Sequence, residues 1–154
     1  KSKSKIFVAN EKTIRSFIKM KFGKRIILAK TGNDPYIAEI RKAAGIFAIS
    51  GYQVIYLGAS AATEMIVLSA INEDPDAILI EFSPGKSMQI FLDIKKMLMQ
   101  KGKGEILLTG RGILPEAEHL RLNTRGVGRI FSSETRWEEI LKYVSNWIEE
   151  NPRI

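Results

Sequence analysis

Three side chains that could do chemistry lie close together in the stretch KTGNDPYIAE, residues 30–39. Lys30 offers an ammonium group, Asp34 a carboxylate and Tyr36 a phenol. The stretch follows KRIILA, an apolar run typical of a strand that is covered on both faces. Because ligands of parallel α/β sheets bind at the carboxyl ends of the strands, this order of residues indicates a binding site in the loop.

Oxygen-bearing side chains at other predicted strand ends leave a second kind of chemistry open. Glu81 and Thr109, together with Asp34, could hold Mg²⁺, which prefers hard oxygen ligands. A switch domain that takes Mg²⁺ or phosphate is therefore one alternative. It would need an acidic pair around the first strand and a lysine after the fifth, whereas the first strand ends in Lys30 and serines follow the fifth.

Other catalytic motifs are incomplete. SPGKS, residues 83–87, opens a predicted helix after a strand, but it lacks the first glycine of G-x-x-x-x-G-K-[ST], so it indicates at most a modest anion site. The chain has one histidine, His119, and no cysteine, so no Ser-His-Asp or Cys-His set can be assembled. No G-x-G-x-x-G fingerprint of a dinucleotide site is present.

Most of the positive charge lies at the start of the chain. The formal net charge is +7, yet residues 1–25 hold nine basic residues and one acidic residue, a net of +8, and the remainder holds 15 basic and 16 acidic residues, a net of −1. A nucleic-acid-binding body would carry a basic face, so we expect no nucleic-acid partner. No apolar run reaches the roughly 18 residues that span a bilayer, and no signal peptide is visible. We therefore expect a cytoplasmic protein without a membrane contact.

Strand and helix patterns alternate along the rest of the chain. Apolar runs predict strands at residues 24–30, 53–58, 76–82, 105–110 and 127–132, and amphipathic stretches after each of them predict helices. Right-handed crossovers then give an α/β fold, a flavodoxin-like, doubly wound, five-stranded parallel sheet of order 2-1-3-4-5. We expect a single domain over residues 24–150, preceded by a basic arm and an extra amphipathic N-terminal helix over residues 1–23.

Three segments of the chain resemble the cobalamin (vitamin B12)-binding domain family of methylmalonyl-CoA mutase type. KRIILAKTGND resembles the family's first strand and loop, TGRGILP its fourth strand and G-G-x-I-P turn, and RGVGRIF the stretch before its G-P-G-T loop. The spacing fits without large gaps from about residue 11 to the last helix. The resemblance implies the same flavodoxin-like fold and a corrinoid site at the strand ends.

In that family the first loop reads D-x-H-x-x-G, and its histidine, oriented by the aspartate, is the lower ligand of cobalt. Lys30 and Asp34 match the supporting lysine and the aspartate, while Tyr36 stands in the place of the histidine and Glu39 in that of the glycine. A phenol is a poor substitute for imidazole, because phenols generally lose their proton only with a pKa of about 10. The resemblance is therefore to a divergent member that lacks the histidine ligand.

The groove that takes the cofactor's nucleotide tail in the family also differs here. Residues 81–83 align with its S-x-L, Arg111 with the second glycine of G-G, and Ser132 and Glu134 with the glycines of G-P-G-T. Glu81 and Arg111 could form an ion pair across this groove. The site residues expected at the strand ends are Lys30, Gly32, Asp34, Tyr36, Glu81, Ser83, Gly110, Arg111, Ser132 and Ser133.

These departures lead to three functional hypotheses. The first is an accessory, non-catalytic module that keeps the fold but has lost the cobalamin site with a histidine on cobalt. It would be a subunit, a duplicated domain or a holder of a different ligand, and we expect no cofactor in it. The second is a cobalamin carrier of a mutase or methyltransferase that binds base-on, with the cofactor's own base on cobalt. The third is the Mg²⁺- or phosphate-dependent switch. In none of them is the isolated chain expected to be an enzyme, and we expect a protein partner or a homo-oligomer.

Overall fold

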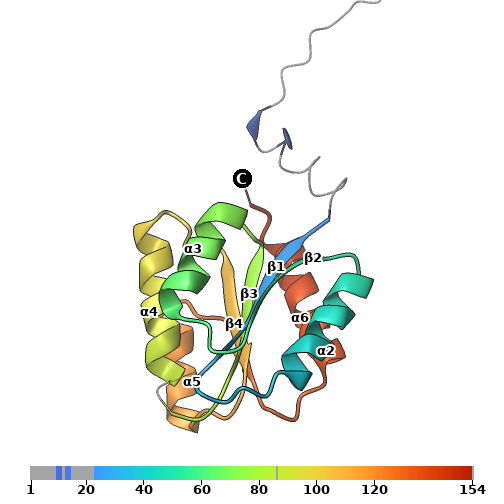
Figure 1. Cartoon of the computed structure of the whole chain (residues 1–154). Helices are drawn as coiled ribbons and strands as arrows, with labels where there is room; N and C mark the ends of the chain where they lie inside the picture. Colours follow the sequence, from blue (N-terminus) through green and yellow to red (C-terminus); the bar gives the residue numbers. More distant parts are fainter. Residues whose placement is uncertain (1–9, 12, 15–22, 86, 154) are drawn as a thin grey trace, which may run out of the picture.

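The computed structural model describes residues 10–11, 13–14, 23–85 and 87–153. The described strands form one parallel sheet of order β2-β1-β3-β4-β5, which confirms the order predicted from the sequence (Figure 1). The strands are β1 (Arg25–Thr31), β2 (Gln53–Gly58), β3 (Ala77–Phe82), β4 (Leu107–Arg111) and β5 (Ile130–Phe131). The helices are α2 (Ala38–Ile49), α3 (Thr63–Glu73), α4 (Ser87–Gln100), α5 (Glu116–Thr124) and α6 (Trp137–Glu150).

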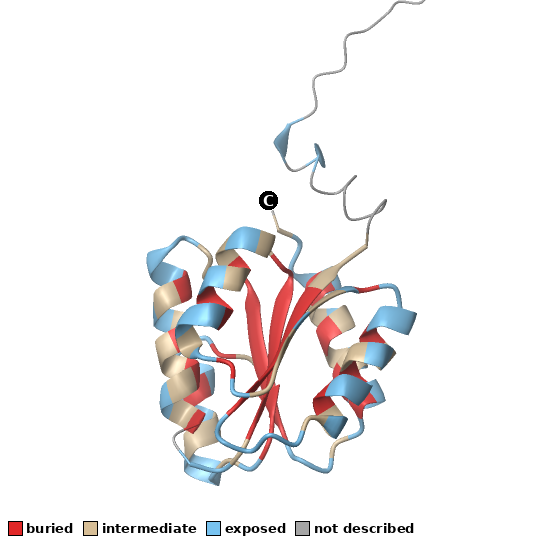
Figure 2. Ribbon diagram, in the orientation of Figure 1, coloured by how far each residue is buried: buried red, intermediate tan, exposed pale blue. Residues whose placement is uncertain are grey.

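Helices cover both faces of the sheet because successive residues of each strand point to opposite sides. Along β3, Ile78 and Ile80 pack with α3, α4 and α5, whereas Ala77 and Leu79 pack with α2 and α6. Figures 1 and 2 show these two groups of helices on either side of the buried strands. The buried charged residues among those described lie at or beside the strand ends instead: Lys30, Asp76, Glu81 and Arg111.

β5 differs most from its prediction. The sequence predicts a strand over residues 127–132, whereas the structure has only Ile130–Phe131, paired with the end of β4. The Val127 N–H donates to the Leu122 carbonyl of α5 at 3.0 Å, while the Gly128 N–H already donates to the Leu108 carbonyl of β4 at 2.7 Å. The bond of Val127 ties the chain to the end of α5, so regular pairing with β4 begins only at Ile130.

Part of the predicted N-terminal helix is described. Asn10 Oδ1 accepts the Thr13 N–H at 2.7 Å, as an N-cap residue does. Most of the arm lies outside the described residues, so the division into an arm over residues 1–23 and a domain over residues 24–150 stays a prediction. No helix in the described part of the chain is long and apolar enough to cross a membrane.

Candidate functional site at the carboxyl end of the sheet

Three charged side chains stand side by side at the carboxyl end of the sheet. Lys30 of β1 lies opposite Glu81 of β3 in the strand register, and Glu81 lies opposite Arg111 of β4. Lys30 Nζ is 3.7 Å from Glu81 Oε1, and Arg111 Nη1 donates to Glu81 Oε2 at 3.3 Å. All three residues are buried. The predicted ion pair between Glu81 and Arg111 is thus present, and Lys30 extends it to a third strand.

Arg111 has further partners on the helices that cover this face. Its guanidinium lies over the ring of Trp137, 4.4 Å from the ring centroid, and its Nε donates to the Thr135 carbonyl at 3.0 Å. Glu39 pairs with Arg111 at 3.6 Å and accepts the indole N–H of Trp137 at 3.0 Å. A planar guanidinium can stack and donate hydrogen bonds at once. The cluster therefore joins β4 to α2 and α6 and closes the space between them at this edge.

Glu81 is a buried carboxylate whose pKa is shifted by its surroundings. Burial raises its pKa above the ordinary value, and the positive charges of Lys30 and Arg111 offset this effect only in part. Glu81 Oε1 is buried and lies 3.7 Å from Lys30 Nζ, beyond the length of a hydrogen bond. The ion pair with Lys30 offsets part of the free-energy cost of burying this oxygen.

The loop after β1 brings Tyr36 to the rim of the same edge. Asp34 Oδ1 accepts the backbone N–H of Tyr36 at 3.0 Å, and Asp34 Oδ2 accepts the Lys30 ammonium at 3.4 Å. The hydrogen bond from the Tyr36 backbone, and then the contact with Lys30, hold the pKa of Asp34 below its ordinary value. Gly32, at a φ of +93°, makes the turn out of the strand. The Tyr36 side chain is 62% exposed beside this fixed backbone.

The remaining predicted site residues lie at the same edge but face different surroundings. Ser132 and Ser133 follow β5 and are exposed, and Ser83 follows β3 and is half-buried. Gly110 faces the opposite side of the sheet, because a Cβ there would lie 2.5 Å from the ring of Phe91 on α4. Gly110 therefore allows close packing of α4, and the three serines line the rim.

The three residues proposed for Mg²⁺ are engaged with other groups. Thr109 is fully buried and its hydroxyl donates to the Arg129 carbonyl, while Asp34 and Glu81 both face Lys30. Within the described ranges, no group of three His, Cys, Asp or Glu side chains is placed to hold a metal ion. The geometry therefore gives no support to the switch hypothesis.

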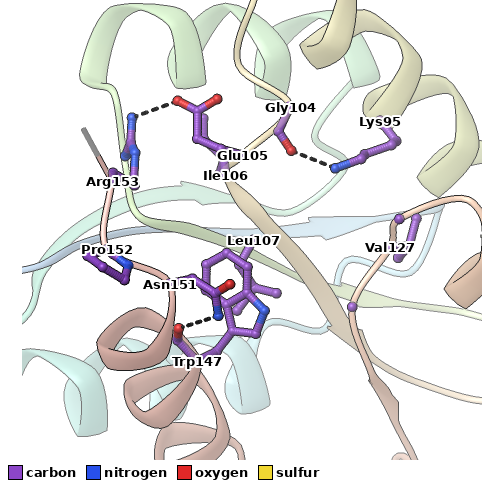
Figure 3. Close-up of a pocket in the computed structure, with 12 residues that line it drawn as sticks. Lys95, Gly104, Glu105, Ile106, Leu107, Val127, Trp147, Asn151, Pro152 and Arg153 are labelled. Carbon is purple, nitrogen blue, oxygen red and sulfur yellow. Dashed lines mark hydrogen bonds and ion pairs between the residues drawn. The ribbon is translucent and has the colours of Figure 1, made fainter.

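A cavity of about 600 Å³ opens at the other end of the sheet, among the loops that precede β4 and β5 (Figure 3). It has an apolar floor and the ring of Trp147 beside it. Its cations are bonded within the protein: Lys95 Nζ donates to the Gly104 carbonyl at 2.7 Å, and Arg153 pairs with Glu105 at 3.4 Å. Because these charges are engaged and ligands of parallel sheets bind at the other end, the carboxyl end is the better candidate.

Comparison with known proteins shows the family to which the chain belongs. The model of the B12 binding domain matches residues 24–141. The chain is 26% identical over 124 residues to the 2-hydroxyisobutanoyl-CoA mutase small subunit of Aquincola tertiaricarbonis, covering 80% of this chain and 91% of that protein. It is 31% identical over 121 residues to the pivalyl-CoA mutase small subunit of Xanthobacter autotrophicus, covering 79% and 81%. A cobalamin-binding protein from Desulfitobacterium hafniense superposes with a TM-score of 0.69 at 16% identity, over 82% of this chain and 60% of that one.

The chain therefore belongs to the B12-binding domain family, as its motifs indicated, and it is related to CoA mutase small subunits. The prediction that it holds no cofactor is wrong, because the family that matches is one of B12 binding. That prediction gave too much weight to Glu81 and Arg111. Their ion pair closes the space between the sheet and its helices, but the loop that carries Asp34 and Tyr36 stays exposed at the rim.

The residues at this edge fit a corrinoid that brings its own axial base. The chain's one histidine, His119, lies on α5 with Nε2 3.2 Å from the Leu114 carbonyl, and the β1–α2 loop has none. The stack of Arg111 on Trp137 closes the space beneath the edge. The exposed hydroxyls of Ser132 and Ser133 at the rim suit a ligand with N–H groups at its periphery, as the amide side chains of corrinoids provide.

Sequence reasoning missed two partners of Arg111. It places Trp137 on the inner face of the last helix as a core residue, and it treats Glu39 only as the residue in place of a glycine. The structure joins these two side chains across 98 residues of sequence, so no local pattern could link them. One signal was available in the sequence. Trp137 is an aromatic residue at the start of α6, and the loop before α6 follows the carboxyl end of β5.

Proposed function

We propose that the chain is the cobalamin-binding subunit or domain of an acyl-CoA mutase and that it binds the cofactor base-on. Adenosylcobalamin supplies radical chemistry to such enzymes when it is bound. The family match supports the cofactor class, and the kinship with two proteins named as mutase small subunits supports the reaction class.

One observation carries the base-on mode. Arg111 lies over Trp137 and bonds to Glu81, and this packed cluster occupies the space beside the strand ends on the face of α2 and α6. When the cofactor's own base leaves cobalt, its nucleotide tail needs space between the sheet and the helices. A base that stays on cobalt needs no such space. Tyr36, in the place where the family has its histidine, offers no nitrogen ligand to compete with it.

The chain's own residues would hold and orient the corrinoid at the carboxyl end. Asp34 fixes the backbone of the loop, and Lys30 balances the charges of Asp34 and Glu81. The exposed hydroxyls of Ser132 and Ser133 would meet polar groups at the corrinoid periphery. The Arg111 cluster keeps water and the nucleotide tail out of the sheet.

The chain supplies the cofactor, and a larger subunit or a separate domain supplies the substrate site. The chain covers most of the length of two relatives that are named as small subunits, which supports this division of labour. Alone, the chain is expected to turn over no acyl-CoA ester.

The test is to incubate the purified protein with hydroxocobalamin or adenosylcobalamin, desalt the mixture and record the visible spectrum. Cobalamin reduced to the cobalt(II) form is then measured by electron paramagnetic resonance, with the protein uniformly labelled with heavy nitrogen. We expect retained corrinoid and a nitrogen splitting unchanged by the label, because the axial nitrogen belongs to the cofactor. A splitting that changes with the label would show a histidine ligand and refute the base-on mode. Loss of all corrinoid on desalting would refute cobalamin binding itself.

A further inference from the structure

Tyr36 is an exposed aromatic residue that nothing in the fold requires. Its side chain is 62% exposed and lies at the rim of the candidate site. Its backbone is fixed all the same, because its N–H donates to Asp34 Oδ1 and Lys30 holds the other oxygen of that carboxylate. A large side chain on a fixed backbone loses little further freedom when a ligand covers it, which favours a role in binding.

The lower face of a base-on cobalamin presents a flat aromatic group, its dimethylbenzimidazole. Tyrosine rings pair with aromatic groups in stacked or edge-to-face arrangements. Resting on the proposed function, we infer that Tyr36 contacts this base and that it makes the site selective for corrinoids that carry an aromatic base over corrinoids that lack one. The ring of Tyr36, and not its hydroxyl, is the part that discriminates.

Other side chains at the rim do not offer the same contact. Glu81, Lys30 and Arg111 are buried and bonded to one another. Ile113, in the loop after β4, is 61% exposed but has no aromatic ring. Tyr36 is thus the exposed aromatic residue that the described loops at the carboxyl ends present to a ligand, and Tyr56 on β2, 39% exposed, provides a matched aromatic outside those loops.

The experiment compares two ligands on four proteins. Cobalamin carries the base, and cobinamide lacks the base together with its nucleotide. Each is titrated by visible spectroscopy and by calorimetry into the wild type, Tyr36→Phe, Tyr36→Ala and Tyr56→Ala. We expect Tyr36→Ala to weaken cobalamin binding by about 3- to 10-fold, the range of an aromatic pair, and to leave cobinamide binding unchanged. Tyr36→Phe and Tyr56→Ala should bind both ligands as the wild type does.

The outcomes separate this inference from the proposed function. If the wild type binds cobalamin and Tyr36→Ala weakens both ligands equally, or neither, the inference is overturned and the proposed function stands. If the wild type binds no cobalamin, both are overturned. Thermal unfolding of Tyr36→Ala checks its fold, and we expect a midpoint close to that of the wild type because the side chain is exposed.

Discussion

Two clusters of buried charge lie at opposite ends of the sheet, and one carboxylate of each, Glu81 and Asp74, has its pKa shifted in opposite directions. At the carboxyl end, burial raises the pKa of Glu81 in spite of two neighbouring cations. At the amino end, burial would also raise the pKa of Asp74, but hydrogen bonds and charge from Arg153, and then from Lys103, bring it from 3.8 to about 2. Desolvation dominates in the first cluster and ion pairing in the second.

The amino-end cluster is built around Arg153, which follows the last helix. Its side chain is 5% exposed; it bonds to Asp74 and to the Pro75 carbonyl, and it pairs with Asp76 at 3.8 Å and Glu105 at 3.4 Å. These acceptors belong to the loops before β3 and β4. The cluster therefore fastens the segment after α6 to the loops of the sheet, and Asp74 gains from being ionised.

The amino-end cluster stabilises the fold, whereas the carboxyl-end cluster holds charged groups in place at the expected binding surface. The charges of the carboxyl-end cluster come from the strands themselves and stand in register, with Glu81 between Lys30 and Arg111. Such a cluster yields less stability than its ion pairs suggest, because desolvation offsets them. It keeps a fixed arrangement of charge where the ligand is expected.

The largest predicted effect is that of breaking the carboxyl-end cluster at its cation. In Arg111→Met, Glu81 loses its hydrogen-bonded partner inside the protein and Trp137 loses its stacked guanidinium. We expect the free energy of unfolding to fall by about 3–5 kcal/mol, the usual cost of leaving a buried charge with too few partners. Urea unfolding followed by circular dichroism measures it.

Two further arginine variants give reference values for the loss of stability expected in Arg111→Met. Arg153→Met removes one cation of the other cluster, in which Asp74 and Glu105 are partly solvated and Lys103 remains beside Asp74, and it should cost about 2 kcal/mol. Arg136→Met removes an 81% exposed side chain and should cost less than about 0.5 kcal/mol. A smaller loss for Arg111→Met than for Arg153→Met would show that Lys30 alone compensates the buried charge of Glu81.

Acid should weaken the amino-end cluster through Asp74. The folded-state pKa of about 2 lies below the ordinary value of 3.8, so this stabilisation is fully present above about pH 4 and is lost as the pH falls through about 2. Because the side chain is about one-third exposed, we expect a contribution of about 1–2 kcal/mol. Urea unfolding of the wild type and Asp74→Asn between pH 2 and pH 7 measures it.

The matched control is Glu64→Gln, which changes an exposed carboxylate on α3. Its stability should follow that of the wild type over the whole pH range, whereas the difference between the wild type and Asp74→Asn should shrink in acid. An equal difference at pH 7 and at pH 2 would show that Asp74 acts through its shape and not through its charge.

The smallest predicted effect of pH on stability is expected from Glu81, and its sign is opposite to that of Asp74. Its folded-state pKa is raised, so the folded protein holds this proton more tightly than the unfolded chain does. Stability should therefore fall as the pH rises from about 4.5 through the folded-state pKa, and Glu81→Gln should remove that slope with a change of less than about 1 kcal/mol. If the stabilisation by Glu81 instead grew as the pH rose, Glu81 would behave as Asp74 does and the contrast between the clusters would fail.

Much of the fold follows from patterns that are local in sequence. Continuous apolar runs predict β1, β2 and β3 to within a residue or two, and the alternation of strands with helices predicts the order of the sheet. β5 is shorter than its apolar residues indicate, because the hydrogen bond from Val127 to Leu122 ties the preceding chain to the end of α5. Such competition between partners is a tertiary effect that no window of sequence contains.

The candidate site was predictable where its residues act within one loop or at aligned strand ends. The pairing of Lys30 with Asp34 and of Glu81 with Arg111 follows from spacing and register. The stack of Arg111 on Trp137 does not, since it depends on how α6 packs against the sheet. The prediction of no cofactor failed for a related reason: a filled groove was read from residue types, without the geometry that leaves the rim exposed.

The short β5 also has a consequence for how the domain fluctuates. β4 has a strand on both sides only at Gly110 and Arg111, while its first residues border loops and the cavity of Figure 3. Local opening occurs most readily where a backbone has the fewest packed neighbours. Slow local opening of the sheet, on the timescale of amide hydrogen exchange, is therefore expected at the end away from the proposed corrinoid site, so that this site keeps its shape between successive binding events.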